Sequence, residues 1–250
     1  MKISGDEFLA QDKKAITLIG MSGVGKSYIS CALAEWGWTN YSCDYLIGTK
    51  YLGELIKSEG EMSAGNIANL SDFVGQLGDE AQGGTDLDEF RRRQKLYYGA
   101  ERDVLRDMGA ALERAEGHFV CDSSGSLCEV EDETVLEDVG RKSLMVYLKV
   151  RQEGQAEILK RALDYPKPLY FPPAFLDERL ARYMDEFELN DVQDIHPVEF
   201  LRWIFPHLFE SRLPKYERLA KKYGVVLPSH KVCLDSEKAF FECIAGALDE

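Results

Sequence analysis

The sequence lacks an excess of basic residues and has no long apolar run. Its 250 residues carry a formal net charge of −14, which argues against nucleic acid or an anionic membrane as a partner, because both attract basic surfaces. No run approaches the roughly 18 consecutive apolar residues of a membrane span, and residues 1–14 are polar and acidic rather than signal-like. These features predict a soluble, intracellular protein without a nucleic-acid or membrane partner.

Cysteine and histidine are few, and their spacing excludes two kinds of structural site. The six cysteines form no Cys-x-x-Cys pair, and several lie in apolar runs. We therefore expect buried, reduced thiols and a cytoplasmic protein rather than a disulfide framework or a zinc site. The four histidines have no mutual spacing suited to a metal site, so we interpret them as structural or surface residues. An apolar content of 45% is still enough for a sizeable core.

The sequence does contain a repeated alternation of apolar strands and helical segments. Strands are predicted at 15–19, 38–43, 118–122, 144–150 and 224–227, and helices at 26–36, 45–58, 87–115, 130–140, 152–163 and 236–248. Strands alternating with helices are typical of an α/β fold whose parallel sheet carries helices on both faces. The prediction is a three-layer, doubly wound, parallel five-stranded sheet in a single domain of residues 1–250.

Two regions exceed this minimal core. Residues 59–86 are rich in Gly, Asn, Ser and Asp and are predicted to be loop-like. Residues 164–223 contain proline-punctuated helical stretches at 173–188, 197–209 and 213–223, with many aromatic side chains. We interpret most of these rings as the core of a helical subdomain, and a surface that binds a protein partner is the alternative.

The most specific motif is a phosphate-binding loop at residues 20–27, which reads Gly-Met-Ser-Gly-Val-Gly-Lys-Ser. It lies between a predicted strand and a predicted helix, the context that the motif requires. Backbone N–H groups of such a loop and the positive end of the helix dipole bind phosphate oxygens. The sequence therefore predicts ATP and Mg²⁺ as cofactors, with Lys26 at the β- and γ-phosphates and Ser27 on the metal. The nucleotide-binding candidates here are Gly20, Ser22, Gly23, Val24, Gly25, Lys26, Ser27 and Tyr28.

Further short motifs follow the loop in a fixed order. Residues 42–47 read Ser-Cys-Asp-Tyr-Leu-Ile, and residues 119–126 read Phe-Val-Cys-Asp-Ser-Ser-Gly-Ser. Arg161 precedes Lys-Pro-Leu-Tyr at 167–170, and residues 212–220 read Arg-Leu-Pro-Lys-Tyr-Glu-Arg-Leu-Ala. With the phosphate loop, this series resembles the shikimate kinase family and, more loosely, the nucleoside-monophosphate-kinase-like phosphotransferases.

The resemblance implies a role for each motif. Asp44 would contact the acceptor hydroxyl, Gly125 would support the acceptor and the γ-phosphate, and Arg212 would bind an acceptor anion. Pro228 would pack against the adenine. Asp122 ends an apolar strand, which is the position of a Walker-B acid in other phosphate-loop proteins, so it is expected to hold Mg²⁺ through water.

The lid and the acceptor side complete the set of candidates. Arg161 and Lys167 match the family's lid cations, which close over the triphosphate. Tyr97-Tyr98 stand where the family has a second carboxylate-binding arginine, and Arg91 is the candidate that could replace it. A solvated helix face, in which residues 91–93 pair with nearby acids, is the alternative interpretation.

These observations predict an ATP-dependent kinase that transfers the γ-phosphate to a hydroxyl of a small, anionic metabolite. Lys26, Asp44 and Asp122 are its expected catalytic residues. Residues 59–116 would form an acceptor-binding helical region, and 164–223 an expanded helical lid insertion. Two alternatives stay open. One is an ATP-responsive interaction module whose region 164–223 binds a protein partner, and the other is a nucleoside or nucleotide kinase whose aromatic lid stacks on the acceptor.

Overall fold

The computed structural model describes residues 3–57 and 67–250 of the chain. The chain divides into two compact units. The first, which we call the sheet unit, comprises Met1–Asp44, Glu101–Ala156 and Arg212–Glu250. The second, the helical unit, comprises Tyr45–Ala100 and Glu157–Ser211.

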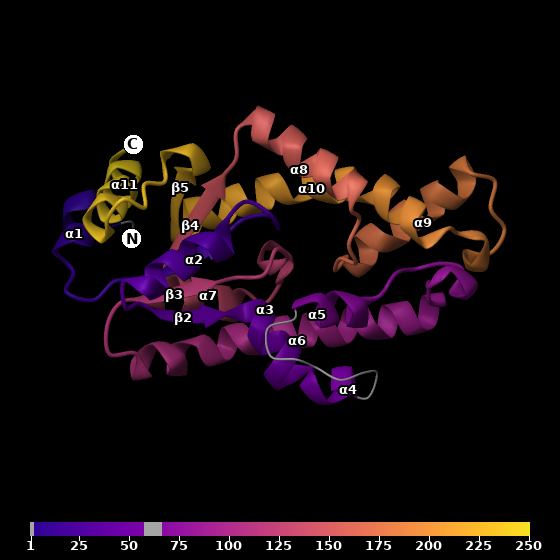
Figure 1. Cartoon of the computed structure of the whole chain (residues 1–250), viewed down its shortest axis with the longest axis horizontal. Coiled ribbons are helices and arrows are strands. Elements are labelled where there is room, and N and C mark those ends of the chain that lie inside the picture. Colours follow the sequence, from indigo (N-terminus) through magenta and orange to yellow (C-terminus); the bar gives the residue numbers. More distant parts are fainter. Residues whose placement is uncertain (1–2, 58–66) are drawn as a thin grey trace. The chain divides into compact units, whose positions relative to one another are not determined.

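A parallel sheet forms the centre of the sheet unit (Figure 1). Within the described residues it has five strands in the order β2-β3-β1-β4-β5, which confirms the predicted doubly wound sheet. Leu18 of the central strand lies opposite Asp122 of β3 and Val146 of β4. Each predicted strand is present to within one residue at either end. The strands are β1 Ala15–Ile19, β2 Thr39–Ser42, β3 Phe119–Asp122, β4 Leu144–Lys149 and β5 Gly224–Pro228.

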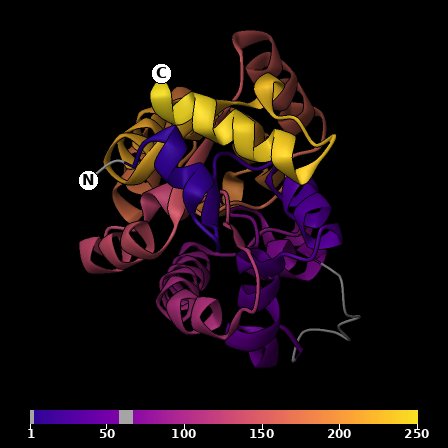
Figure 2. The same ribbon diagram turned by 90° about the vertical axis from the view of Figure 1, so that its left-hand side faces the viewer.

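Alternate residues of β1 face opposite layers of helices, as the two-residue period of a strand requires. Ile16 and Leu18 lie in a core with side chains of α1 (Gly5–Ala10), α2 (Lys26–Glu35) and α11 (Glu237–Asp249). Each large apolar side chain buried there stabilises the fold by about 1.5–3 kcal/mol. Helix α1, which was not predicted, lies against α11 (Figure 2).

The opposite face of the sheet carries α6 (Leu87–Arg114), α7 (Glu133–Lys142) and α10 (Pro197–Tyr223). Thr17 of β1 donates to the Met108 sulfur of α6, and Tyr147 of β4 stacks on Tyr216 of α10 at 5.3 Å between ring centroids. Helices therefore cover both faces of the sheet, which confirms the three-layer prediction. The remaining helices are α3 Cys43–Leu46, α4 Gly53–Lys57, α5 Ile67–Val74, α8 Gln152–Asp164 and α9 Pro173–Glu186.

Two helix predictions were wrong in detail. Residues 45–58 do not form one helix, because a five-residue π-helical segment, Ile47–Tyr51, separates α3 from α4. Leu52 follows it with φ −112° and ψ 2°, outside the α-helical region. Part of the predicted loop 59–86 is the helix α5, since Leu70, Phe73 and Val74 are buried at helical spacing. Residues 58–66 lie outside the described part of the chain.

The two helices predicted at 197–209 and 213–223 are one continuous helix, α10. Pro206 and Pro214 lie inside it, although proline lacks the N–H that an α-helix uses and costs about 3 kcal/mol in a helix interior. Burial along the whole helix outweighs this cost. Its fully buried side chains include Phe200, Ile204, Leu208, Tyr216 and Leu219.

Several aromatic residues of region 164–223 pack in a core of the helical unit, as interpreted from the sequence, whereas Tyr216 packs in the sheet unit. Tyr183 of α9 contacts the rings of Phe187, Phe200 and Trp203, with centroids 4.5, 5.0 and 5.2 Å away. Phe171 and Phe90 belong to the same core. Two rings remain largely outside it, since Tyr165 is 74% exposed and Phe187 49% exposed.

All six cysteines are free thiols, as predicted, but only Cys43, Cys121 and Cys128 are buried. The Cys43 and Cys121 sulfurs lie 3.6 Å apart in the sheet unit. In the part of the chain that the structure describes, no helix is both long and apolar enough to cross a membrane.

Candidate active site

The phosphate-loop sequence connects β1 to α2. Gly20 and Gly25 have φ angles of 144° and 101°, a backbone conformation that favours glycine. Gly25 is the N-cap of α2, and among the described residues no side chain caps this helix end. The first N–H groups of α2 thus have no capping side chain, and the positive end of the helix dipole lies beside them. This is the arrangement that binds a phosphate group.

Lys26 lies within the loop rather than in solvent. Its Nζ donates to the carbonyl oxygens of Gly20 at 2.7 Å and Met21 at 3.1 Å, and the residue is 6% exposed. Burial lowers the pKa of its ammonium group, while Asp122 and then Asp44 act in the opposite direction. The lysine and both candidate carboxylates therefore belong to one electrostatic cluster at the carboxyl ends of β1, β2 and β3.

Asp122 ends β3 and is 7% exposed. Burial raises its pKa, and hydrogen bonding to the Ser27 hydroxyl is the main opposing influence, followed by Lys26 and Ser30. Its Oδ1 atom has no hydrogen-bond partner among the described residues. A buried carboxylate oxygen without a partner costs free energy, and a cation or a metal-bound water would remove that cost.

The residues around Asp122 fit a magnesium ion. Mg²⁺ prefers oxygen ligands, and it is commonly held by a few protein oxygens with water and substrate phosphates. The Ser27 hydroxyl and the unpartnered Asp122 oxygen supply ligands of this kind beside the phosphate loop. No group of three or more His, Cys, Asp or Glu side chains forms a metal site within residues 3–57 and 67–250.

Asp44 lies in α3, directly after β2, and is half-buried. Burial raises the pKa of its carboxyl group to about 6, with Lys26 acting in the opposite direction and Asp122 adding to the rise. At neutral pH the group is mostly ionised, and it takes up a proton in the mildly acidic range. A carboxylate with a pKa near the working pH is suited to accept a proton from a hydroxyl group.

Gly125 lies against the phosphate loop. A Cβ atom at this position would lie 3.0 Å from the backbone nitrogen of Ser22, which is closer than ordinary packing allows. The Gly125 carbonyl oxygen accepts hydrogen bonds from Arg212 at 3.0 Å and from the Tyr216 hydroxyl at 2.5 Å. Residues of α10 therefore support the turn after β3 where this turn contacts the loop.

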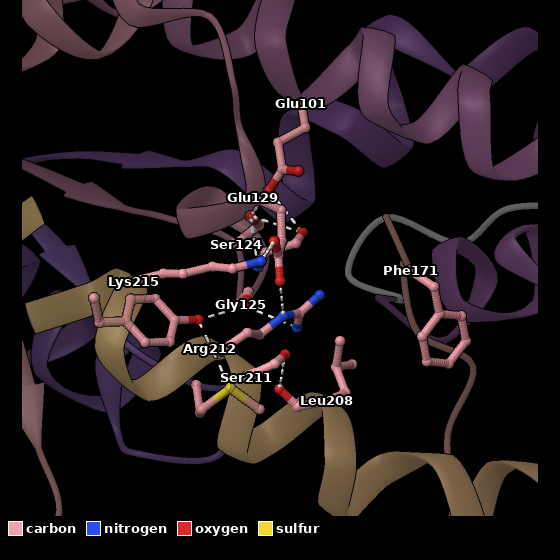
Figure 3. A network of polar contacts seen from close by, with 12 residues as sticks. Glu101, Ser124, Gly125, Glu129, Phe171, Leu208, Ser211, Arg212 and Lys215 are labelled. Carbon is pink, nitrogen blue, oxygen red and sulfur yellow. Dashed lines mark hydrogen bonds and ion pairs between the residues drawn. The ribbon is translucent and has the colours of Figure 1, made fainter. Parts of the chain in front are cut away.

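Arg212 is buried and ion-paired within the sheet unit (Figure 3). Its Nε donates to Oε1 of Glu129 at 3.0 Å, and both side chains are 2% exposed. Lys215, one turn further along α10, binds the second oxygen of the same carboxylate. The sequence prediction assigned Arg212 to an acceptor anion, whereas here its guanidinium contacts a carboxylate of the chain itself.

Glu101 is a buried carboxylate on α6, close to the turn after β3 (Figure 3). One of its oxygens accepts hydrogen bonds from the Ser124 and Ser126 hydroxyls, and its Oε2 has no partner in the described residues. Burial raises its pKa to about 7, although the two serine hydrogen bonds and Arg212 act in the opposite direction. Its charge is therefore half neutralised at physiological pH.

Glu101→Gln is expected to change the pH dependence of stability. In the wild type, the folded protein holds the Glu101 proton more tightly than the unfolded chain does, because the pKa is about 7 when folded and 4.5 when unfolded. The stability that comes from this difference is fully present below pH 4.5 and is lost as the pH rises through about 7. We expect wild type to lose about 3 kcal/mol of unfolding free energy over this window, and the variant to lack that loss. Urea unfolding at pH 4.5 and 8.5 measures both. Glu113→Gln, an exposed position of α6, is the control, and parallel pH profiles for Glu101→Gln and wild type would contradict the expectation.

Two other candidates of the sheet unit lie at the same edge of the sheet. Tyr28 is in the first turn of α2 and is 74% exposed. Pro228 ends β5 opposite Lys149 of β4 and is half-buried. Carboxyl ends of parallel strands meet at one edge of a sheet, and ligands of open α/β sheets bind there.

The remaining candidates belong to the helical unit. Arg161 lies in α8, and Lys167 lies in the segment between α8 and α9. Arg91 makes an exposed ion pair with Asp177 at 2.7 Å, and Arg92 and Arg93 both pair with Glu89. Arg92 and Arg93 thus make the pairs with Glu89 that the solvated-face interpretation expected, whereas Arg91 pairs with Asp177 of α9.

Strand order and loop position together decide the fold: a phosphate loop follows the central strand of a parallel sheet and opens a helix. This is the arrangement of a P-loop α/β fold. A shikimate kinase from Bacteroides thetaiotaomicron is 16% identical with a TM-score of 0.42, and covers 92% of this chain and 94% of its own. A shikimate kinase from Aquifex aeolicus is 18% identical with a TM-score of 0.43, over 94% and 96% of the two chains.

A gluconokinase from Sinorhizobium meliloti is 17% identical with a TM-score of 0.32, over 85% of this chain and 96% of its own. No family model matches the sequence, and no curated protein matches it either. All three matches have TM-scores below 0.5 and identities below 20%.

Sequence reasoning missed the polar network around Arg212. Glu101, Glu129 and Lys215 were not candidates. Glu101 lies in phase with the buried Tyr97, Val104 and Met108 of α6, so helical spacing could have found it, whereas Glu129 lies in a short 3-10 turn without such a period. Glu129, four residues after the Ser-Ser-Gly sequence, carried no signal of its own, because its partner Arg212 is 83 positions away in the sequence.

Proposed function

We propose that the chain is an ATP-dependent phosphotransferase that transfers the γ-phosphate to a hydroxyl group of a small metabolite. The observation that carries this proposal is the cluster of Lys26, Asp44 and Asp122 beside the phosphate loop. All three influence one another's charge state within the sheet unit. A nucleotide seat, a metal carboxylate and a carboxylate near neutral pKa are the parts that phosphoryl transfer to an alcohol requires.

The phosphate loop binds the triphosphate in this proposal. Backbone N–H groups of residues 22–27 and the helix dipole of α2 bind the phosphate oxygens. Lys26 leaves the carbonyl oxygens of Gly20 and Met21 and donates to the transferring group, where it neutralises developing charge. Lys26 therefore exchanges its hydrogen bonds to the loop carbonyl oxygens for hydrogen bonds to phosphate. This exchange does not require a new helix or strand to form.

Ser27 and Asp122 are the residues that would hold magnesium, Ser27 directly and Asp122 through water. The metal, when bound, neutralises negative charge on the β- and γ-phosphate oxygens. Asp122 also receives the Ser27 hydrogen bond, which orients the hydroxyl oxygen toward the loop.

Asp44 orients the acceptor hydroxyl and accepts its proton. The acceptor oxygen forms a bond to the γ-phosphorus as the bond from that phosphorus to the ADP oxygen breaks, and ADP leaves. Transfer of this kind depends on positioning and charge neutralisation more than on covalent chemistry. Gly125 and Arg212 are the proposed acceptor-side residues of the sheet unit, and Tyr28 and Pro228 are further proposed nucleotide contacts.

Asp44→Asn is expected to lower kcat of phosphoryl transfer by about 10²-fold, because the amide cannot accept the proton. In the wild type, kcat/KM should fall below a pH of about 6, where Asp44 becomes protonated. The variant should lose this acidic limb. ADP formation with hydroxy acids, sugars, polyols and nucleosides as acceptors measures both effects.

Asp12→Asn is the matched control, since Asp12 is exposed in the same unit. Undiminished transfer by Asp44→Asn would remove this residue from the mechanism. Nucleoside acceptors in the panel also test the alternative that the chain is a nucleoside or nucleotide kinase.

The interaction-module alternative makes a different prediction. Tyr165 and Phe187 of the helical unit expose 74% and 49% of their surface, and exposed rings are common at protein interfaces. Slow ATP hydrolysis that no acceptor accelerates, together with nucleotide-dependent binding of a protein by region 164–223, would favour this function over the kinase.

A further inference from the structure

Arg212 already has a carboxylate partner inside the chain, and this partner bears on which acceptor the proposed kinase uses. Glu129 accepts from Nε of Arg212 at 3.0 Å, and neither side chain exposes more than 2% of its surface. The carboxylate also binds Lys215 of the same helix. Glu129 thus gives one oxygen to the buried Arg212 and the other to Lys215, whose side chain is 35% exposed (Figure 3).

The position of Glu129 follows from local structure. It ends the 3-10 turn Leu127–Glu129 after β3, and its N–H donates to the Ser126 carbonyl oxygen at 2.7 Å. The turn directs the glutamate side chain to the face of α10 that carries Arg212 and Lys215. Arg212 also holds the Gly125 carbonyl oxygen, so its guanidinium is bound at the turn by two different groups.

The surrounding charges make an additional anion unfavourable. In the described part of the sheet unit, the cluster contains Lys26, Arg212 and Lys215 as cations and Asp44, Glu101, Asp122 and Glu129 as acids. Carboxylates therefore equal or outnumber cations even before a triphosphate enters. A carboxylate brought to Arg212 would compete with Glu129 in a buried setting of low dielectric, where repulsion between two carboxylates is strong.

We propose that Glu129 is a specificity-determining residue that neutralises Arg212 and so selects a neutral hydroxyl compound, such as a polyol, over a carboxylate-bearing acceptor. This inference rests on the proposed kinase function and refines its acceptor class. The anionic acceptor expected from the sequence depended on a positively charged Arg212 without an internal partner.

The test compares matched acceptors with Mg²⁺-ATP and the full chain. Each pair consists of a polyol and the hydroxy acid in which one terminal CH₂OH is replaced by a carboxylate. For wild type, we expect kcat/KM with the polyol to be at least about tenfold higher than with the matched hydroxy acid. A factor of this size corresponds to the loss of one charge-assisted contact. Glu129→Gln keeps an oxygen for Arg212 but removes the charge, and should raise kcat/KM for the acid about tenfold.

Two variants accompany Glu129→Gln. Glu131→Gln removes the same charge at an exposed position two residues away and should leave the discrimination unchanged. Glu129→Asp keeps the charge and should retain the preference for the polyol. If circular dichroism shows that Glu129→Gln does not fold, kcat/KM of wild type and of Glu129→Asp with the acceptor pairs tests the inference. A preference for the polyol in both proteins supports it, and a preference for the acid in wild type contradicts it.

The outcomes separate the inference from the kinase proposal. Preferred transfer to the acid by wild type, lost in Arg212→Lys, would overturn the inference and leave the kinase function standing. Absence of transfer to every acceptor, with ATP binding intact, would overturn the kinase function. In that case calorimetric binding of the hydroxy acid to the protein with Mg²⁺-ADP decides: tighter binding by Glu129→Gln supports the role of Glu129, and equal or tighter binding by wild type refutes it.

Discussion

Replacing Lys26 with methionine is expected to lower kcat for phosphoryl transfer by about 10³-fold, the size of effect seen when one charge-stabilising donor is removed from an active site. The fold should survive the change. Lys26 is buried, and burial lowers the pKa of its ammonium group, so the apolar methionine chain of similar length removes a desolvated charge. Activity is then lost for a chemical reason rather than through unfolding.

Steady-state ADP formation with a productive acceptor measures kcat, and thermal unfolding measures stability. Lys238→Met is the control, because the Lys238 side chain is 86% exposed on α11 and pairs only loosely with Glu242 at 3.7 Å. A Lys26→Met protein that keeps its melting temperature and at least a tenth of wild-type kcat would show that this lysine does not stabilise the transferring phosphate.

Arg212→Leu is expected to lower the free energy of unfolding by about 4 kcal/mol. The substitution leaves Glu129 buried with Lys215 as its remaining cation partner and removes the hydrogen bond to the Gly125 carbonyl oxygen. An uncompensated buried charge costs much more than the ion pair itself contributes, which is why removing one partner is severe. Urea unfolding at pH 7 measures the difference.

The double variant Arg212→Leu/Glu129→Leu should recover most of that stability, because both charges are then absent and the site is filled by apolar groups. Arg218→Leu is the control on the same helix, since Arg218 is exposed and its loss should change stability by less than about 0.5 kcal/mol. Equal destabilisation by Arg212→Leu and the double variant would show that the pair is not the source of the effect.

The sheet could be predicted from the sequence because its strands are short, apolar and bounded by turn residues. Residues 15–19 show the clearest case, since an apolar run leads directly into the glycines of the phosphate loop and forms β1 as expected. Helices α6 and α11 were equally clear from their apolar spacing. In each of these elements, local pattern and tertiary burial favour the same conformation.

Predictions failed where tertiary packing overrode local preference. The proline-punctuated sequence predicted separate helices at 197–209 and 213–223, but burial of side chains in both halves keeps α10 continuous. Residues 67–74 belong to the stretch 59–86, whose Gly, Asn, Ser and Asp content indicated a loop, yet three apolar side chains at helical spacing pack and form α5. The expected single helix at 45–58 is interrupted by a π-helical segment that no propensity scale indicates.

By itself the sequence determined the α/β class, the strand positions and the phosphate loop, since these depend on patterns within about ten neighbouring residues. Only the tertiary structure decided the charge state and partners of the site residues. Arg212 and Glu129 are 83 positions apart in sequence, and burial raises the pKa of Asp44 to about 6 only once the chain has folded around it. The pKa of a side chain depends on its neighbours in space and on the exclusion of water, and a short stretch of sequence determines neither of these.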